Sequence, residues 1–272
     1  MHLPTPRGPI TAALFERLTR PPHGFDPPAV PAGESVVDDE DLQLALFTCY
    51  ELHYQGFDGV DDRWEWEPSL LRQRGALEER FERGLEVIVP RPGTPPAHIR
   101  HALTELVANA EEGPSLAAFL DRKADLDQFR EFVAHRSVYH LKEADPHTWA
   151  IPRLFGLHRR HRGALLGHLA AFEMTSSLPN RRYGRGLRRL GGDAAACLFY
   201  DEHVQADAVH EQIAVHDMCG GFAAEHPVLA GDVLYGAACA LALDRLFTER
   251  ILDRWGRGST LLCEAGLAVS GR

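Results

Sequence analysis

The segment DAAACLFYDEHVQADAVHEQIAVHDMCGG, residues 193–221, carries the most informative pattern in this chain of 272 residues. Its apolar residues recur at helical spacing between alanines, so we expect a mostly buried helix. His203, Asp207 and His210 stand at positions i, i+4 and i+7, which at about 100° per residue places them within an arc of roughly 60°. Two imidazoles and a carboxylate on one face of a buried helix are costly to desolvate unless a partner compensates.

A divalent cation is one such partner, because it accepts neutral imidazole nitrogen and carboxylate oxygen directly as ligands. The alternative is a solvent-facing polar stripe, in which His203 and Asp207 form an ordinary pair one helical turn apart. A zinc-protease motif is excluded, since His210 and Glu211 begin an HExxH pattern whose second histidine would fall on Ala214.

Two glutamates outside this segment are further candidate ligands. Glu173 follows Leu166 and Leu169 by two turns and one turn, so its carboxylate is expected on the apolar side of a helix. The alternative there is a buried glutamate that is hydrogen-bonded to a neighbouring arginine. Glu143 stands on a mixed helix face, where a glutamate is usually solvated. Carboxylate and imidazole without thiolate favour iron or manganese over structural zinc, and helix bundles build di-iron sites from such inward ligands.

The rest of the chain has mostly helical periodicity from Val37 onward, which predicts an all-α architecture. Eight of the 18 prolines lie in the first 31 residues and predict an irregular arm over residues 1–36, interrupted at most by a short helix; a disordered tail is the alternative. Residues 37–92 are expected to form a helical accessory region and residues 93–272 a helical bundle. LEVIV, residues 85–89, is the one stretch predicted as a strand.

The composition bounds the class of protein. A net charge of −10 argues against a broad nucleic-acid surface, and 44% hydrophobic with 25% charged residues is typical of a soluble globular chain. No continuous apolar run approaches the roughly 20 residues of a membrane span, and the N-terminus lacks a secretory signal. The five cysteines form no CxxC pair, which favours buried thiols in a reducing compartment. We therefore expect a cytoplasmic protein without nucleic-acid or membrane partners.

These residues resemble a known family, the iron-containing redox enzymes of the haem-oxygenase-like di-iron oxidase superfamily, in particular the actinobacterial branch. The resemblance implies a shortened haem-oxygenase-like multi-helical bundle that binds non-haem iron and oxidises a small molecule with oxygen. It does not imply haem. It rests on EFVAHRSVYHLKEADPHTWAIPRL (131–154), LFGLHRRHRGALLGHLAAFEMTSSLPNRRYGRGLRRL (154–190), FYDEHVQADAVHEQIAVHD (199–217) and, near the N-terminus, DLQLALFTCYELHYQGFDGVDDRWEWEPSLL (41–71).

The resemblance implies five metal ligands, which are Glu143, Glu173, His203, Asp207 and His210. It also implies a gap. Relatives carry a further segment between the WAIPRL-like and LFGLHRR-like stretches, with a helix that bears a glutamate and, several residues later, a histidine. Here the two stretches abut at residues 152–156, so those two ligands have no counterpart. The sequence leaves open whether any of the histidines at 158, 161 and 168 compensates.

Two functions from different classes follow. In the first, the chain is an iron-dependent oxidoreductase that uses Fe(II), as one or two ions, and dioxygen as co-substrate. Its centre would then be altered or mononuclear, since two histidines and one carboxylate suffice for a facial triad. In the second, the chain is a degenerate, non-catalytic member of the family that binds a ligand or a partner. A third reading, haem binding through a proximal histidine, lacks a matching motif.

Two further expectations concern partners. Removal of one helix from a bundle bares the apolar faces of its neighbours, so we expect a homodimer or repacking by residues 37–90. The arginines that follow Glu173 either attract an acidic small-molecule substrate or are simply solvated; they are Arg181, Arg182, Arg185 and Arg188. The sequence names neither the substrate nor the electron donor.

Overall fold

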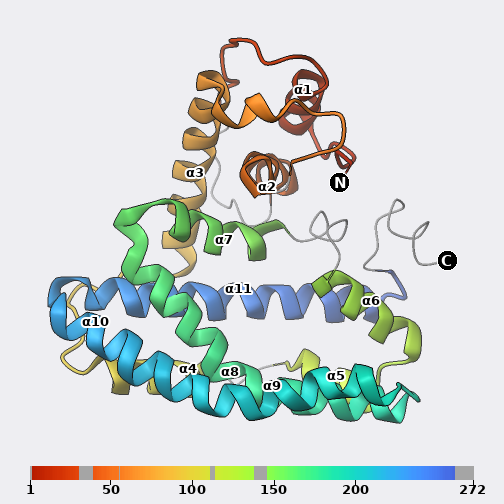
Figure 1. The fold of residues 1–272 in the computed structure, drawn as a ribbon, viewed down its shortest axis with the longest axis vertical. Coiled ribbons are helices and arrows are strands. Elements are labelled where there is room, and N and C mark those ends of the chain that lie inside the picture. The colour runs from red at the N-terminus through yellow and green to blue at the C-terminus, as the bar shows by residue number, and fades with distance from the viewer. Residues whose placement is uncertain (1, 31–38, 55, 111–113, 138–145, 261–272) are drawn as a thin grey trace. The chain divides into compact units, whose positions relative to one another are not determined.

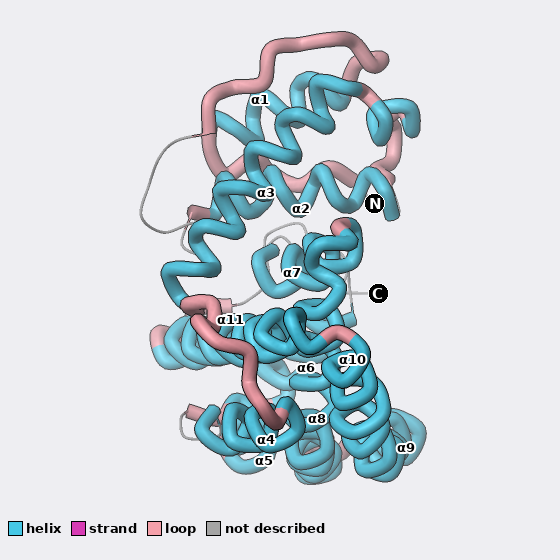
Figure 2. The backbone as a smooth tube through the Cα atoms, turned by 90° about the vertical axis from the view of Figure 1, so that its left-hand side faces the viewer, coloured by secondary structure: helices cyan, strands magenta, loops and turns pink. Residues whose placement is uncertain are grey.

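The computed structural model describes residues 2–30, 39–54, 56–110, 114–137 and 146–260 (Figure 1). Helices and loops make up this part of the chain, and it contains no strand (Figure 2). The all-α prediction is therefore confirmed. The chain divides into two compact units, with one division between Pro90 and Arg91 and another between Leu154 and Phe155.

The first unit contains helices from the N-terminal third of the chain, α1 (Pro9–Leu18), α2 (Glu40–Tyr54), η1 (Asp62–Trp66) and α3 (Pro68–Ile88). Helix α1 lies inside the segment predicted as an irregular arm, and it packs on α2 with Leu14 and Leu18 fully buried. The Asp41 carboxylate of α2 accepts hydrogen bonds from the backbone N–H groups of Ile10 and Thr11, each at 2.8 Å. These bonds satisfy amide donors that the first turn of a helix leaves unpaired.

The strand prediction for residues 85–89 is wrong, because α3 continues through Ile88. Its first turn is capped by Glu67, whose carboxylate accepts a hydrogen bond from the Leu70 N–H at 2.9 Å. Helix propagation from this start adds one backbone bond per residue, whereas a strand needs a partner strand, and the described residues offer none. Val87 consequently lies 73% exposed on the helix surface.

The second unit holds most of the remaining helices. They are α4 (Ile99–Ala110), α5 (Leu116–Arg122), α6 (Leu126–Ser137), η3 (Arg159–His161), α8 (Arg162–Arg189), α9 (Ala194–Gln212), the π-helix η4 (Ile213–Cys219), α10 (Gly220–Glu225), η5 (Pro227–Leu229) and α11 (Ala230–Gly256). Helix α7 (Pro146–Leu157) begins in the first unit and its last three residues belong to the second. The two family-like stretches that abut at residues 152–156 thus meet inside one continuous helix.

Helix α8 is the centre of the second unit, where it contacts α11, α9 and α5. At one point of its contact with α11 the two backbones touch directly. A Cβ atom on Gly167 would lie 1.8 Å from the carbonyl oxygen of Val233, and one on Gly236 would lie 1.9 Å from the carbonyl oxygen of Ala164. Both positions therefore require glycine, because any side chain would force the two helices apart.

The segment Pro227–Gly256, which includes α11, is long and apolar enough to cross a membrane by length and composition alone. The core helix of a water-soluble protein has the same composition. Helix α11 fits that description, since Val233, Ala237 and Leu243 are buried and Gly236 lies against α8. In its most apolar stretch, 44% of the residues are buried inside the structure.

The glycine contact gives a stability prediction. We expect Gly167→Ala to lower the free energy of unfolding by about 2 kcal/mol or more, because the added methyl group must displace the backbone of α11. Urea denaturation followed by circular dichroism measures the change. The control is Gly221→Ala in α10, where an added Cβ meets nothing within 4 Å. Equal stability of the two variants would contradict the close contact.

Candidate metal centre

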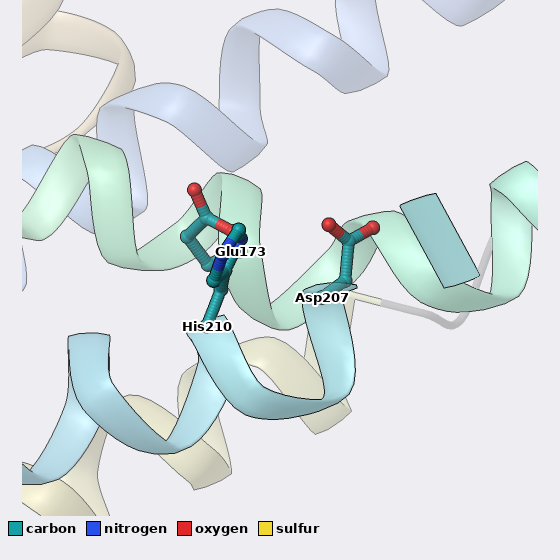
Figure 3. Close-up of side chains that lie close together, drawn as sticks. All are labelled: Glu173, Asp207 and His210. Atoms are coloured by element: carbon teal, nitrogen blue, oxygen red, sulfur yellow. The ribbon is translucent and has the colours of Figure 1, made fainter. Parts of the chain in front are cut away.

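Three of the predicted ligands come together between α8 and α9. Glu173 of α8 and Asp207 and His210 of α9 offer two carboxylate oxygens and one imidazole nitrogen that all lie within 4.8 Å of one another (Figure 3). The Nδ1 atom of His210 is 3.3 Å from Oε2 of Glu173. We call Glu173, Asp207 and His210 the triad.

Local sequence features place the two helices side by side. Leu187 and Gly192 join by a backbone hydrogen bond of 2.9 Å, and Gly191 takes a φ of +81°, which closes the turn between α8 and α9. Asp193 then caps α9 by accepting a hydrogen bond from the Ala196 N–H at 2.7 Å. At Gly184 the helices pass so closely that a Cβ would lie 3.4 Å from that of Tyr200.

The three side chains of the triad differ in their exposure to solvent. Asp207 is 4% exposed, and the side chains of Glu173 and His210 are 25% and 54% exposed. Oδ2 of Asp207 accepts a hydrogen bond from Nδ2 of Asn180 at 3.2 Å. Because Asn180 is neutral, this bond orients the buried carboxylate without balancing its charge.

In the part of the chain that the structure describes, no lysine or arginine pairs with the carboxylates of the triad. The arginine partner that we considered for Glu173 is not found, since Arg185 pairs with Asp121 and Arg188 with Asp201. The donor set is thus two carboxylates and one imidazole without a resident cation. Such a set fits a divalent metal ion with oxygen and nitrogen ligands.

His203 lies on α9 one turn before Asp207 but is not part of the triad. Its Nδ1 donates a hydrogen bond of 2.7 Å to the carbonyl oxygen of Phe199, one turn earlier in the same helix. Because a carbonyl oxygen can only accept, this bond assigns the proton to Nδ1 and leaves Nε2 with the lone pair that a metal ligand needs. Its role as a ligand stays a prediction. Glu143 lies outside the described residues.

The expectation that α9 is mostly buried is wrong. Leu198, Phe199, Val209 and Ile213 are between 49% and 59% exposed. Helix α9 makes its main contacts with α8 and the following η4, so its opposite side stays open. Asp207 is buried because it belongs to the side that faces α8, and the apolar residues lie away from it.

Sequence reasoning missed the π-helix that follows the triad. Helix α9 continues into η4, Ile213–Cys219, whose wider turns shift the side chains after His210 relative to an α-helical register. Cys219 in η4 donates a hydrogen bond of 3.6 Å to the Leu166 carbonyl, and burial raises the pKa of its thiol to about 12. The sulfur is therefore a neutral packing group and no thiolate ligand.

The histidines that might have replaced the missing ligands do not join the triad. His161 and His168 are buried among aromatic rings, and the His168 ring centroid lies 4.9 Å from that of Phe172. His158 lies beside His161, with ring centroids 6.2 Å apart. Burial lowers the pKa of His168 from 6.5 to about 4. His168 is thus a neutral core residue at physiological pH.

This shift predicts a pH dependence of stability. Between pH 6.5 and 4 the unfolded chain binds a proton at His168 that the folded chain does not, so stability falls as the pH is lowered, by at most about 1.4 kcal/mol per pH unit. Between pH 6.5 and 4.5, we expect the free energy of unfolding of His168→Leu to fall by about 2 kcal/mol less than that of the wild type. Urea titrations at each pH measure this, with the exposed His216→Leu as control. Parallel pH profiles for wild type and His168→Leu would contradict the burial of a neutral imidazole.

Comparison with known proteins places this part of the chain in a family. Residues 153–245 match a family model described as iron-containing redox enzyme, and the matched region includes the whole triad and His203. A search of curated proteins finds no match to the chain. The resemblance inferred from the sequence is confirmed over residues 153–245, which match the model of iron-containing redox enzymes of the haem-oxygenase-like superfamily.

Proposed function

We propose that the triad binds Fe(II) and that the protein is a non-haem iron-dependent oxidoreductase that oxidises a small molecule with dioxygen. The observation that carries this proposal is the convergence of two carboxylate oxygens and an imidazole nitrogen within 4.8 Å, in a region that matches an iron-containing redox family. Iron, when bound, would supply the electrons that activate dioxygen.

The residues of the triad have distinct tasks in this proposal. Glu173 and Asp207 provide negative charge that neutralises a divalent ion, and Asn180 holds the Asp207 carboxylate in place. His210 provides the nitrogen ligand, and His203 is proposed as a further ligand through Nε2. Three or four protein ligands leave coordination positions open for dioxygen and substrate. For this donor set we propose that each chain binds one iron ion.

The alternative is a non-catalytic helical bundle that retains the fold. The observation that favours it is the 54% exposure of the His210 side chain, since an open site excludes water poorly. Anaerobic loading with Fe(II), followed by exposure to air in an oxygen electrode, separates the two functions. The oxidoreductase is expected to take up iron and consume dioxygen, and a non-catalytic bundle does not consume it.

The ligand assignment predicts the effect of substitutions on iron uptake. Wild-type protein titrated anaerobically with Fe(II) is expected to bind close to one ion per chain. Asp207→Asn and His210→Ala each remove one donor and should weaken binding by about tenfold or more. His203→Ala should also weaken it.

The control for this titration is His216→Ala, since His216 is exposed in η4 and lies outside the triad. It is expected to bind iron like the wild type. Retention of full affinity by both Asp207→Asn and His210→Ala would refute the assignment. An uptake of two ions per chain would place additional ligands outside the triad.

We also propose that the protein is a homodimer in a reducing cytoplasm. The four described cysteines at 49, 197, 219 and 239 are buried and form no disulfide, which agrees with a reducing compartment. The exposed apolar side chains of α9 support self-association, because monomers rarely expose such a row.

Self-association through α9 predicts the effect of a charge on that surface. Leu198→Glu, at a position that is 54% exposed, is expected to shift the chain from dimer to monomer in sedimentation velocity. Val228→Glu is the control, because Val228 is 82% exposed in η5 on another element. A wild-type chain that sediments as a monomer would contradict the proposal.

A further inference from the structure

We infer that the cavity beside the triad binds a small organic acid through Arg182. This inference names the substrate class of the proposed oxidoreductase and so rests on that function. Three observations support it. They are the position of the cavity, the absence of an acidic partner for Arg182 among the described residues, and the link between the cavity and the triad through one side chain.

The cavity lies between α8 and α11, beyond the close contact at Gly167 and Gly236, and has a volume of about 290 Å³. Val107, Ala110, Pro114 and Ser115 close a further side. Apolar groups such as Ala171, Phe172 and Tyr183 of α8 contribute to its wall. Polar side chains such as Thr175, Ser176 and Thr248 contribute the rest of the wall, so the cavity fits a small molecule that has both an apolar and a polar part.

Three charged side chains line the cavity, Arg182, Arg245 and Asp244, and of these Arg182 is the group that we propose holds an anion. Arg245 is paired with Glu249 at 3.0 Å, so its charge is balanced within α11. The Nη1 group of Arg182 donates a hydrogen bond of 3.1 Å to Oγ of Ser115, and no carboxylate pairs with Arg182 in the described part of the chain. A guanidinium that is held in place by a neutral hydroxyl keeps its charge and most of its donors for a ligand, and a carboxylate matches its planar geometry.

The neighbouring arginines do not share this property. Arg185 and Arg188 are each paired with an aspartate, and Arg181 is exposed and does not line the cavity. Arg189, the fifth arginine that follows Glu173 in α8, donates to backbone carbonyls and does not line the cavity, so Arg182 is the one of the five that combines a place in the cavity wall with the lack of an acidic partner among the described residues.

Asn180 connects the cavity to the triad. It lines the cavity and donates the hydrogen bond of 3.2 Å to Asp207. Phe172, another wall residue, directly precedes Glu173 in α8. Glu173, Asp207 and His210 do not themselves line the cavity, so an acid held at Arg182 would be linked to the triad through Asn180 and would have Phe172 beside its apolar body.

Benzoate and its neutral isostere benzamide are the probes that test this inference. Calorimetry or saturation-transfer NMR on the full metal-free chain is expected to show benzoate binding about tenfold more tightly than benzamide. Arg182→Gln should remove this preference, and Arg182→Lys should retain part of it because the cation remains. Arg181→Gln is the matched control and should behave like the wild type. Circular dichroism checks the fold of each variant.

Equal binding of benzoate and benzamide to the wild type would overturn the inference without any variant. An unchanged preference in Arg182→Gln would overturn it as well. Titration of the same preparations with Fe(II) separates this failure from that of the proposed function. Iron uptake without benzoate preference refutes the acid site alone, and benzoate preference without iron uptake leaves the acid site supported and refutes the iron-dependent oxidoreductase.

Discussion

The close backbone contact between α8 and α11 is the constraint on which the second unit depends. Gly167 and Gly236 bring the two backbones together so closely that neither position accepts a Cβ atom. Helix α8 is thereby fixed along one side, and its remaining surface is free to carry Glu173 toward α9 and Arg182 toward the cavity. Both proposed binding functions therefore use the same helix, and a shift of α8 would move both together.

The chemistry of the triad follows from what surrounds it. A carboxylate as buried as Asp207 is normally paired with a cation, but here it receives one hydrogen bond from a neutral amide. Glu173 is likewise without a lysine or arginine partner among the described residues, although arginines are abundant in α8. Two of them, Arg185 and Arg188, pair with Asp121 and Asp201 instead. The region thus separates its arginine–aspartate pairs from the group of donors that we propose binds an added cation.

Part of this arrangement could be predicted from the sequence, and the reasons for the failures are physical. Helical spacing placed Asp207 and His210 on one face, and this held because α9 is a regular helix up to Gln212. The same periodicity wrongly predicted burial of Phe199 and Val209, since a pattern along one helix does not reveal whether a neighbour covers each side. Residues 85–89 are rich in β-branched residues, which favour strands, but the described part of the chain offers no strand for them to pair with, and α3 continues through Ile88. Nothing in the local sequence identified Asn180, whose role depends on a contact with another helix.

The central claim is that iron is held between α8 and α9 by the triad. Crystals grown without oxygen in the presence of Fe(II), with diffraction recorded at the iron absorption edge, test it directly. We predict one anomalous peak per chain within bonding distance of the Glu173 and Asp207 carboxylates and the His210 imidazole. An anomalous peak bound elsewhere, or none in crystals of protein that takes up iron in solution, would contradict the claim.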